Sequence, residues 1–357
     1  MRVRPANSHF NGWKNIMTNL KNQKKIKESP LFWPTKLVGK GRDMSLYILD
    51  ETLIPKELHY IKVKNAREAV TVIQQMKTRA FGQFLVVLNT FLLEINIAAT
   101  GLKSGSESEK QLLNRIKKTA IALNSSRPTF PFSEVTSIVV RWAESAFKNK
   151  MNIKLFVTKN IKGYLSGIRF KRLERVQKIA DLINNGDSIL THCNVSGELA
   201  MAAAICKKQK KEVHFFATET RPYLQGSKLT CWELNRLGAN VTLIADNSIG
   251  SLMADGLVNK VIVGSDRSCA NGDFANKIGT YQIAVLSEEF GIPFYVLTQP
   301  SNVVKKGGDI PIEIRKAEEL LSYLGKKVVD GPIDGFYPGF DVVPHELITE
   351  AIAINVS

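Results

Sequence analysis

Short apolar runs alternate with amphipathic segments along the second half of the chain. The apolar runs predict strands near 187–192, 212–217, 240–244, 259–264 and 292–297. The amphipathic segments carry apolar residues at helical spacing and predict helices near 170–182, 196–208, 227–237, 247–255 and 275–289. Short buried strands that alternate with helices are typical of a parallel sheet with helices on both faces. The second half therefore predicts an α/β domain.

The first half has a different pattern. Residues 65–147 repeat apolar side chains at helical spacing, and residues 45–53 predict a strand and a turn before them. The segment before residue 45 is polar, basic and broken by prolines. The sequence thus predicts three parts, which are a basic N-terminal extension at 1–44, a mainly helical domain at 45–150 and the α/β domain at 151–357.

The chain of 357 residues carries a formal net charge of +16, which could attract nucleic acid or a phosphorylated substrate. Seven lysines and arginines and no acidic residue lie within the first 27 positions. No zinc-finger or RRM-type aromatic motif accompanies this charge, so nucleic acid is not the expected partner. We expect the extension to be a solvated arm. Phe10, Trp13 and Ile16 share a helical face, however, and could dock on the body or on a second subunit.

Composition indicates a soluble protein of a reducing compartment. The hydrophobic share of 44% is ordinary, and no stretch approaches the roughly 20 apolar residues of a membrane span. The N-terminus has no apolar signal-peptide core. The four cysteines form neither a CxxC pair nor a zinc-type spacing. The chain also has no dinucleotide fingerprint and no P-loop. We expect a cytoplasmic protein with no metal, no organic cofactor and no membrane partner.

Two titratable residues stand directly after predicted strands. Cys193 follows the strand near 187–192, and Asp266 follows the strand near 259–264. Ligands of open α/β sheets bind at the carboxyl ends of strands, so this thiol and carboxyl could form an acid/base pair. The helix expected just after Cys193 would lower the pKa of the thiol, and burial would raise that of Asp266. The alternatives are a buried structural cysteine and an ion pair between Asp266 and Arg267.

Other polar residues near these positions could bind an anionic sugar. Asn276 and Lys277 stand where a helix is predicted to begin, and lysine together with helix amides can hold a phosphate. Arg221 could clamp a charged group, and Gln225 could bond to sugar hydroxyls. The alternative for Lys277 is a lysine on the protein surface.

Several motifs of the second half occur together in one known family. They include Thr-His-Cys-Asn at 191–194, Glu-Thr-Arg-Pro-Tyr-Leu-Gln-Gly at 219–226, Val-Ile-Val-Gly-Ser-Asp-Arg at 261–267, Ala-Asn-Lys-Ile-Gly-Thr-Tyr at 275–281 and Asp-Ile-Pro-Ile-Glu at 309–313. Over residues 187–352 the chain resembles the methylthioribose-1-phosphate isomerases, which belong to the initiation factor 2B alpha/beta/delta-like family. The resemblance implies a helical N-terminal domain followed by a Rossmann-like catalytic domain.

The resemblance also implies which residues form the site. Cys193 and Asp266 would be the catalytic pair. Substrate contacts would come from Arg79, Ala80, Phe81, Arg127, Gln225, Asn276 and Lys277. Where these isomerases carry Arg-Gly-Ala-Pro-Ala-Ile-Gly, this chain has Arg-Ala-Phe-Gly-Gln-Phe at 79–84. Since glycine permits close backbone approach to a ligand, Phe81 could reshape the pocket.

The implied activity is aldose–ketose isomerisation of 5-methylthioribose 1-phosphate in methionine salvage, by a homodimer without cofactor or metal. A phosphate on the anomeric carbon prevents spontaneous ring opening, so Asp266 would protonate the ring oxygen. Cys193 could then remove the C2 proton as a thiolate, or hydride could pass directly from C2 to C1.

Two alternatives to this activity stay open. The substrate could be another 5-substituted ribose 1-phosphate or ribose 1,5-bisphosphate. The protein could instead be a non-catalytic regulatory protein of the initiation factor 2B type. Those regulatory subunits usually lack the cysteine, so Cys193 favours an enzyme.

Overall fold

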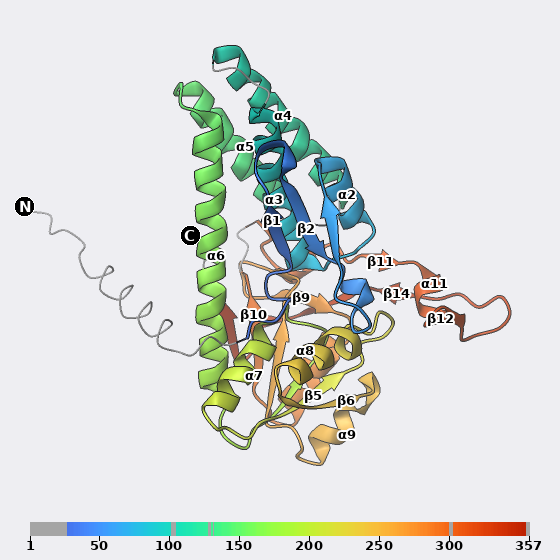
Figure 1. Ribbon diagram of the computed structural model, residues 1–357. Coiled ribbons are helices and arrows are strands. Elements are labelled where there is room, and N and C mark those ends of the chain that lie inside the picture. The colour runs from blue at the N-terminus through green and yellow to red at the C-terminus, as the bar shows by residue number, and fades with distance from the viewer. Residues whose placement is uncertain (1–26, 101–104, 128–129, 131, 300–302, 355–357) are drawn as a thin grey trace, which may run out of the picture.

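The computed structural model describes residues 27–100, 105–127, 130, 132–299 and 303–354. A helical part lies above an α/β part in Figure 1, and the long helix α6 (Ile153–Leu182) runs along both. The first half of α6 buries Val157 and Ile161 in the upper core, and its second half buries Val176 and Ile179 in the lower core. We propose a domain boundary near residue 151, just before α6.

The helical part agrees with the prediction for residues 65–147. It contains α2 (Ala66–Gln74), α3 (Ala80–Ala99), α4 (Ser106–Ser126) and α5 (Phe132–Lys148). Helix α3 is long and apolar enough to cross a membrane, and it is the one such helix in the described part of the chain. It is nevertheless mostly buried among the other helices. Its buried Glu94 forms an ion pair with Arg115 of α4, as expected of a core helix in a folded domain.

A three-stranded antiparallel sheet covers one side of these helices. Its strands are β1 (Thr35–Val38), β2 (Ser45–Leu49) and β3 (Tyr60–Val63), in that order. Only β2 was predicted. The other two are edge strands of four residues, in which Lys36 and Lys62 interrupt the apolar pattern. Their pairing with the buried β2 therefore decides their conformation.

Part of the segment predicted as a solvated extension is packed against the body. Leu31 and Phe32 are buried, and β1 follows them. The solvated-arm expectation is therefore wrong for residues 31–38, because a few isolated apolar residues suffice to anchor the segment. The predicted helical face of Phe10, Trp13 and Ile16 lies outside the described residues.

The α/β part contains one six-stranded parallel sheet. Its strands are β4 (Ser188–Thr191), β5 (His214–Thr218), β6 (Asn240–Ile244), β7 (Lys260–Gly264), β10 (Phe294–Thr298) and β16 (Glu350–Ala353). The five predicted strands are confirmed. The sixth, β16, is an edge strand with one buried residue, Ile352, so it lacks an apolar run. The strand order is β16-β10-β7-β4-β5-β6, so the chain reverses its winding between β4 and β7.

Helices cover both faces of this sheet, as predicted. Alternate strand residues, such as Ile189 and Leu190 of β4, enter different cores. One core includes α6, α7 (Glu198–Lys208) and α8 (Cys231–Arg236). The other includes α9 (Ile249–Ala254) and α10 (Thr280–Glu289). These elements give the Rossmann-like arrangement that was expected.

The predicted helix at 275–289 is wrong at its start. Residues Phe274–Lys277 form strand β9, which lies between β8 (Arg267–Ser268) and β15 (Phe340–Val343) in a small antiparallel sheet. Lys277 pairs with Phe340 in this sheet. A partner more than sixty residues away therefore decides the conformation of this segment.

A projecting arm completes the α/β part. It contains β11 (Ile314–Arg315), α11 (Ala317–Leu320), β12 (Ser322–Tyr323), β13 (Lys326–Lys327) and β14 (Tyr337–Pro338). Figure 1 shows the arm extending to the right of the body. Its base consists of β11 and β14. Residues of this base, such as Arg315, line the candidate site at the carboxyl edge of the parallel sheet.

Candidate active site

A polar cavity of about 130 Å³ lies where β4 and β7 end. These neighbouring strands flank the reversal of strand order, which is where open α/β sheets bind their ligands. All nine catalytic and substrate-contact residues that the family resemblance implied line the cavity. They are Arg79, Ala80, Phe81, Arg127, Cys193, Gln225, Asp266, Asn276 and Lys277. The space suits a small molecule rather than a macromolecule.

Cys193 occupies a strained backbone position beyond the end of β4. Its φ of 60° lies in the left-handed region, which costs a non-glycine residue about 1–3 kcal/mol. Burial raises the pKa of its thiol to about 11, while the charge of Lys277 lowers this pKa and that of Asp266 raises it. The expectation that a helix would lower the thiol pKa is wrong. Helix α7 begins only at Glu198, and burial dominates.

Asp266 is placed by the small antiparallel sheet. Its backbone amide donates to the carbonyl of Ala275 at 3.0 Å, which joins the end of β7 to β9. Burial raises the pKa of its carboxyl, and the charges of Lys277, Arg127 and Arg79 oppose this rise. The predicted rise in pKa is therefore confirmed. No ion pair joins Asp266 to Arg267 among the described residues.

Lys277 is buried rather than exposed, so the surface-lysine alternative is wrong. Its ammonium donates to the carbonyl of Gly339 at 3.0 Å and lies 4.7 Å from the ring centre of Phe340. Burial lowers its pKa, while Cys193 and Asp266 raise it. The side chain thus interacts electrostatically with both titratable groups.

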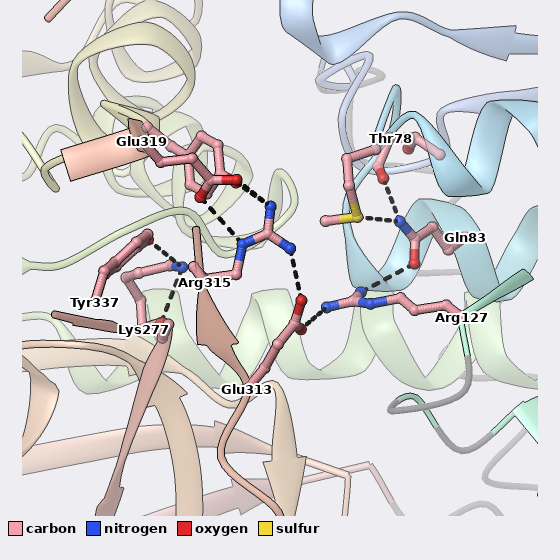
Figure 2. A network of polar contacts seen from close by, with 11 residues as sticks. Thr78, Gln83, Arg127, Lys277, Glu313, Arg315, Glu319 and Tyr337 are labelled. Atoms are coloured by element: carbon pink, nitrogen blue, oxygen red, sulfur yellow. Dashed lines mark hydrogen bonds and ion pairs between the residues drawn. The ribbon is translucent and has the colours of Figure 1, made fainter. Parts of the chain in front are cut away.

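A chain of polar contacts crosses the cavity from the helical part to the arm (Figure 2). Arg127 donates to Gln83 at 3.1 Å and to Glu313 at 3.3 Å. Glu313 also accepts from Arg315 at 2.6 Å, and Arg315 forms a second ion pair with Glu319. An anion that binds Arg127 must therefore displace the carboxylate of Glu313 or share the guanidinium with it.

Glu313 and Arg315 had no role in the sequence interpretation. The Asp-Ile-Pro-Ile-Glu motif contains Glu313, and the charges that alternate at 313 and 315 were the available signal. Arg221, in contrast, does not line the cavity. Its guanidinium donates to the carbonyls of Leu320 and Ser322 and so fastens the arm.

Two polar atoms at the cavity are buried without a hydrogen-bond partner among the described residues. They are Nε of Arg79 and Oε1 of Gln225. An unpaired buried polar atom costs about 1–3 kcal/mol, so such atoms are expected where a ligand completes the bonding. The Nε donor of Arg79 and the Oε1 acceptor of Gln225 are therefore available to bind a polar ligand.

The cavity offers no cluster of metal-binding side chains among the described residues. The one group of that kind in the described ranges is Asp273, His345 and Glu346, and none of these lines the cavity. Asp273 already accepts hydrogen bonds from Gly307 and His345.

Sequence comparison places the chain in a family. The profile of the Initiation factor 2 subunit family matches residues 86–353. The chain belongs to this family. The family resemblance inferred from the motifs is therefore confirmed.

The relatives of the chain include isomerases. The chain is 37% identical to methylthioribose-1-phosphate isomerase of Desulforudis audaxviator, with 87% of this chain and 91% of that protein covered. The corresponding protein of Fervidobacterium nodosum is 35% identical, over 86% and 90%.

Solved structures of family members have the same fold. 5-Methylthioribose 1-phosphate isomerase from Pyrococcus horikoshii has a TM-score of 0.73 and 31% identity, over 92% of this chain and 94% of that one. The translation initiation factor eIF-2B subunit delta from A. fulgidus also has a TM-score of 0.73, with 29% identity over 90% and 94%. The fold alone therefore does not separate the two classes, and the site must do so.

The segment at 79–84, which forms the start of helix α3, departs from the pattern expected of the isomerases, and the structure shows what Phe81 contacts. Its ring lies 3.7 Å from the guanidinium carbon of Arg172 and 5.8 Å from the ring centre of Trp33. Arg172 is buried and paired with Glu198. Phe81, at the start of α3, therefore contacts the buried Arg172 of α6. It also lines the cavity.

Proposed function

We propose that this protein is an aldose–ketose isomerase that converts 5-methylthioribose 1-phosphate into 5-methylthioribulose 1-phosphate in methionine salvage. The relatives named methylthioribose-1-phosphate isomerase match most of the chain at 33–37% identity. The observation that carries the proposal is the meeting of Cys193 and Asp266 in one cavity at the point where the sheet reverses its order.

Ring opening is the first step of this proposal. Burial raises the pKa of the Asp266 carboxyl, which favours its protonated form and suits it to donate a proton to the ring oxygen. The bond between C1 and the ring oxygen then breaks. Asp266 is left as a carboxylate, which the neighbouring charges of Lys277 and Arg127 stabilise.

Hydrogen transfer from C2 to C1 is the second step, and two routes fit the residues. In one route the thiolate of Cys193 takes the C2 proton, and the resulting thiol, whose proton can exchange with solvent, donates a proton to C1. In the other, hydride passes directly from C2 to C1 beside a neutral thiol. In both, the carboxylate of Asp266 can take the proton of the 2-hydroxyl, which restores the acid and leaves the C2 carbonyl.

The raised pKa of Cys193 bears on this choice. A thiol pKa of about 11 leaves about one thiol in a thousand ionised at pH 8 in the ligand-free site. The proton route therefore needs a change in the thiol's surroundings when substrate binds. The hydride route needs none, and the uptake of solvent deuterium separates the two.

Substrate binding is proposed for the remaining residues that line the cavity. Arg79, Ala80 and Phe81 lie at the start of the twenty-residue helix α3, whose first amides favour an anion. The guanidinium of Arg127 and the ammonium of Lys277 add positive charge for the phosphate. Gln225 and Asn276 would bond to sugar hydroxyls.

The proposal is tested by offering purified protein three phosphates in separate reactions, which are 5-methylthioribose 1-phosphate, another 5-substituted ribose 1-phosphate and ribose 1,5-bisphosphate. Ketose formation is followed by NMR, with Cys193→Ser as the inactive control. We expect the methylthio substrate to have the highest kcat/KM. Preference for another phosphate would reassign the substrate.

A non-catalytic regulatory role is the second candidate. The altered segment at 79–84 and the similarity to an initiation factor subunit favour it. The paired Cys193 and Asp266 favour catalysis. Absence of turnover with all three phosphates would favour the regulatory role.

We further propose that the enzyme acts in the cytoplasm as a homodimer. The four cysteines are free, which suits a reducing compartment. The arm exposes Leu324, Val328 and Phe336, and exposed apolar side chains of this kind are common at subunit contacts. Sedimentation or light scattering would measure the mass in solution.

A further inference from the structure

The strained backbone of Cys193 is held on both sides by threonine hydroxyls. The amide of Cys193 donates to Oγ1 of Thr220 at 3.0 Å. Its carbonyl accepts from Oγ1 of Thr230. Because the left-handed conformation is unfavourable for cysteine, contacts of this kind must oppose its relaxation.

Behind this loop lies a buried carboxyl. Asn194 donates to Oγ1 of Thr230 at 3.0 Å and to Oε1 of Glu233 at 2.7 Å. The other oxygen of Glu233 accepts from the hydroxyl of Ser29 at 2.8 Å. Glu233 is 1% exposed. This carboxyl therefore ties the cysteine loop to α8 and to the segment before β1.

We infer that Thr230 and Glu233 are positioning residues, which hold the Cys193 backbone so that its thiol faces the cavity. Neither residue lines the cavity, so both act through Cys193 and Asn194. The inference rests on the isomerase function proposed above. Displacement of a reacting group by about 1 Å can lower a rate about 100-fold, which sets the size of the expected effect.

Pairs of variants separate the loss of a positioning hydrogen bond from a change in side-chain volume. Thr230→Val keeps the shape of the side chain but removes the hydroxyl, and Thr230→Ser restores it. Glu233→Leu removes both acceptors, whereas Glu233→Gln keeps one acceptor for Asn194. Burial raises the pKa of Glu233 to about 7, against the hydrogen bonds of Ser29 and Asn194, so neutral Gln is a fair mimic. Thr90→Val is the control, since it removes a buried hydroxyl that bonds only within α3.

The first measurement is steady-state kinetics. Thr230→Val and Glu233→Leu should lower kcat about 100-fold, with KM within about threefold, because substrate contacts stay in place. Thr230→Ser and Glu233→Gln should recover kcat to within about fivefold of wild type. Thr90→Val should leave both constants unchanged.

The second measurement needs no substrate. Burial holds the pKa of Cys193 near 11, so a loosened loop should expose the thiol and raise its thiolate fraction. Alkylation of Cys193 by iodoacetamide, read by peptide mass spectrometry, should then be at least about threefold faster in Thr230→Val and Glu233→Leu. Thr90→Val should react at the wild-type rate.

The outcomes are distinct. The inference is overturned if Thr230→Val and Glu233→Leu match Thr90→Val in both measurements. If the wild type turns over none of the phosphates but alkylation still differs, the isomerase proposal fails and the positioning of Cys193 stands. Should Glu233→Leu fail to fold, the smaller change Thr230→Val decides the matter by the same criteria.

Discussion

Replacing Lys277 by methionine should weaken substrate binding without weakening the fold. The substitution keeps the length of the side chain and removes a buried positive charge at the cavity. A charge-assisted hydrogen bond contributes about 1.5–3 kcal/mol, so loss of about 2 kcal/mol should raise KM about 30-fold. The charge of Lys277 also lowers the pKa of Cys193 and of Asp266, so both pKa values should rise in the variant.

The thermal stability of the ligand-free Lys277→Met variant should be unchanged or higher, although its substrate binding is weaker. The lowered pKa of Lys277 means that burial opposes its charged form, and removal of the charge removes this cost. Methionine leaves the carbonyl of Gly339 without that donor, which costs about 1–3 kcal/mol. Desolvation of an ion costs several kcal/mol, so the balance favours an unchanged or higher Tm in the ligand-free variant.

Lys260→Met is the matched control on strand β7. Lys260 pairs with the carboxylate of Asp187 at 2.5 Å, and neither residue lines the cavity. This variant should lower Tm, because it leaves the buried carboxylate of Asp187 without its lysine partner, and should leave KM unchanged. Calorimetry and initial rates measure both effects. A KM for Lys277→Met equal to the wild-type value would refute the role of Lys277 in phosphate binding.

Four further outcomes are expected. Cys193→Ser and Asp266→Asn should each lower kcat at least about 100-fold with near-normal Tm, and a near-wild-type rate in either would remove that residue from the pair. Because a general acid must be protonated, kcat/KM should fall as pH rises through the raised pKa of Asp266, and a flat profile would contradict the acid role. Deuterium from heavy water should enter C1 of the product if Cys193 is the base, and its complete absence would support hydride transfer. Deleting residues 1–27 should leave activity within about threefold, since the buried Ser29 and Phe32 remain, whereas aggregation or a change of oligomeric state would show that the extension docks.

Much of the site could be predicted because its signals are local. Parallel strands buried on both faces are continuous apolar runs, such as Val261–Val263 in β7, and they stand out from the helices between them. Cys193 and Asp266 were then found by their place just after such runs. Arg79, Arg127 and Gln225 were found through family motifs, and the fold brings them to the same cavity.

Other features depend on contacts that no local pattern contains. The segment at 274–277 is a strand because β15 pairs with it, although its spacing also suits a helix start. Arg221, which could have clamped a charged group, instead donates to two carbonyls of the arm. Glu313 reaches Arg127 only because the fold brings the residue before β11 to the end of α4.

The amino-acid sequence by itself determined the order of strands and helices and the residue types at the ends of β4 and β7, since apolar runs and motifs are properties of neighbouring residues. Only the tertiary structure decided the electrostatics of the site. A local argument from the following helix predicted a lowered pKa for Cys193, yet burial by both parts of the chain raises it. Desolvation depends on every atom that surrounds a group, and most of those atoms come from residues distant in the chain.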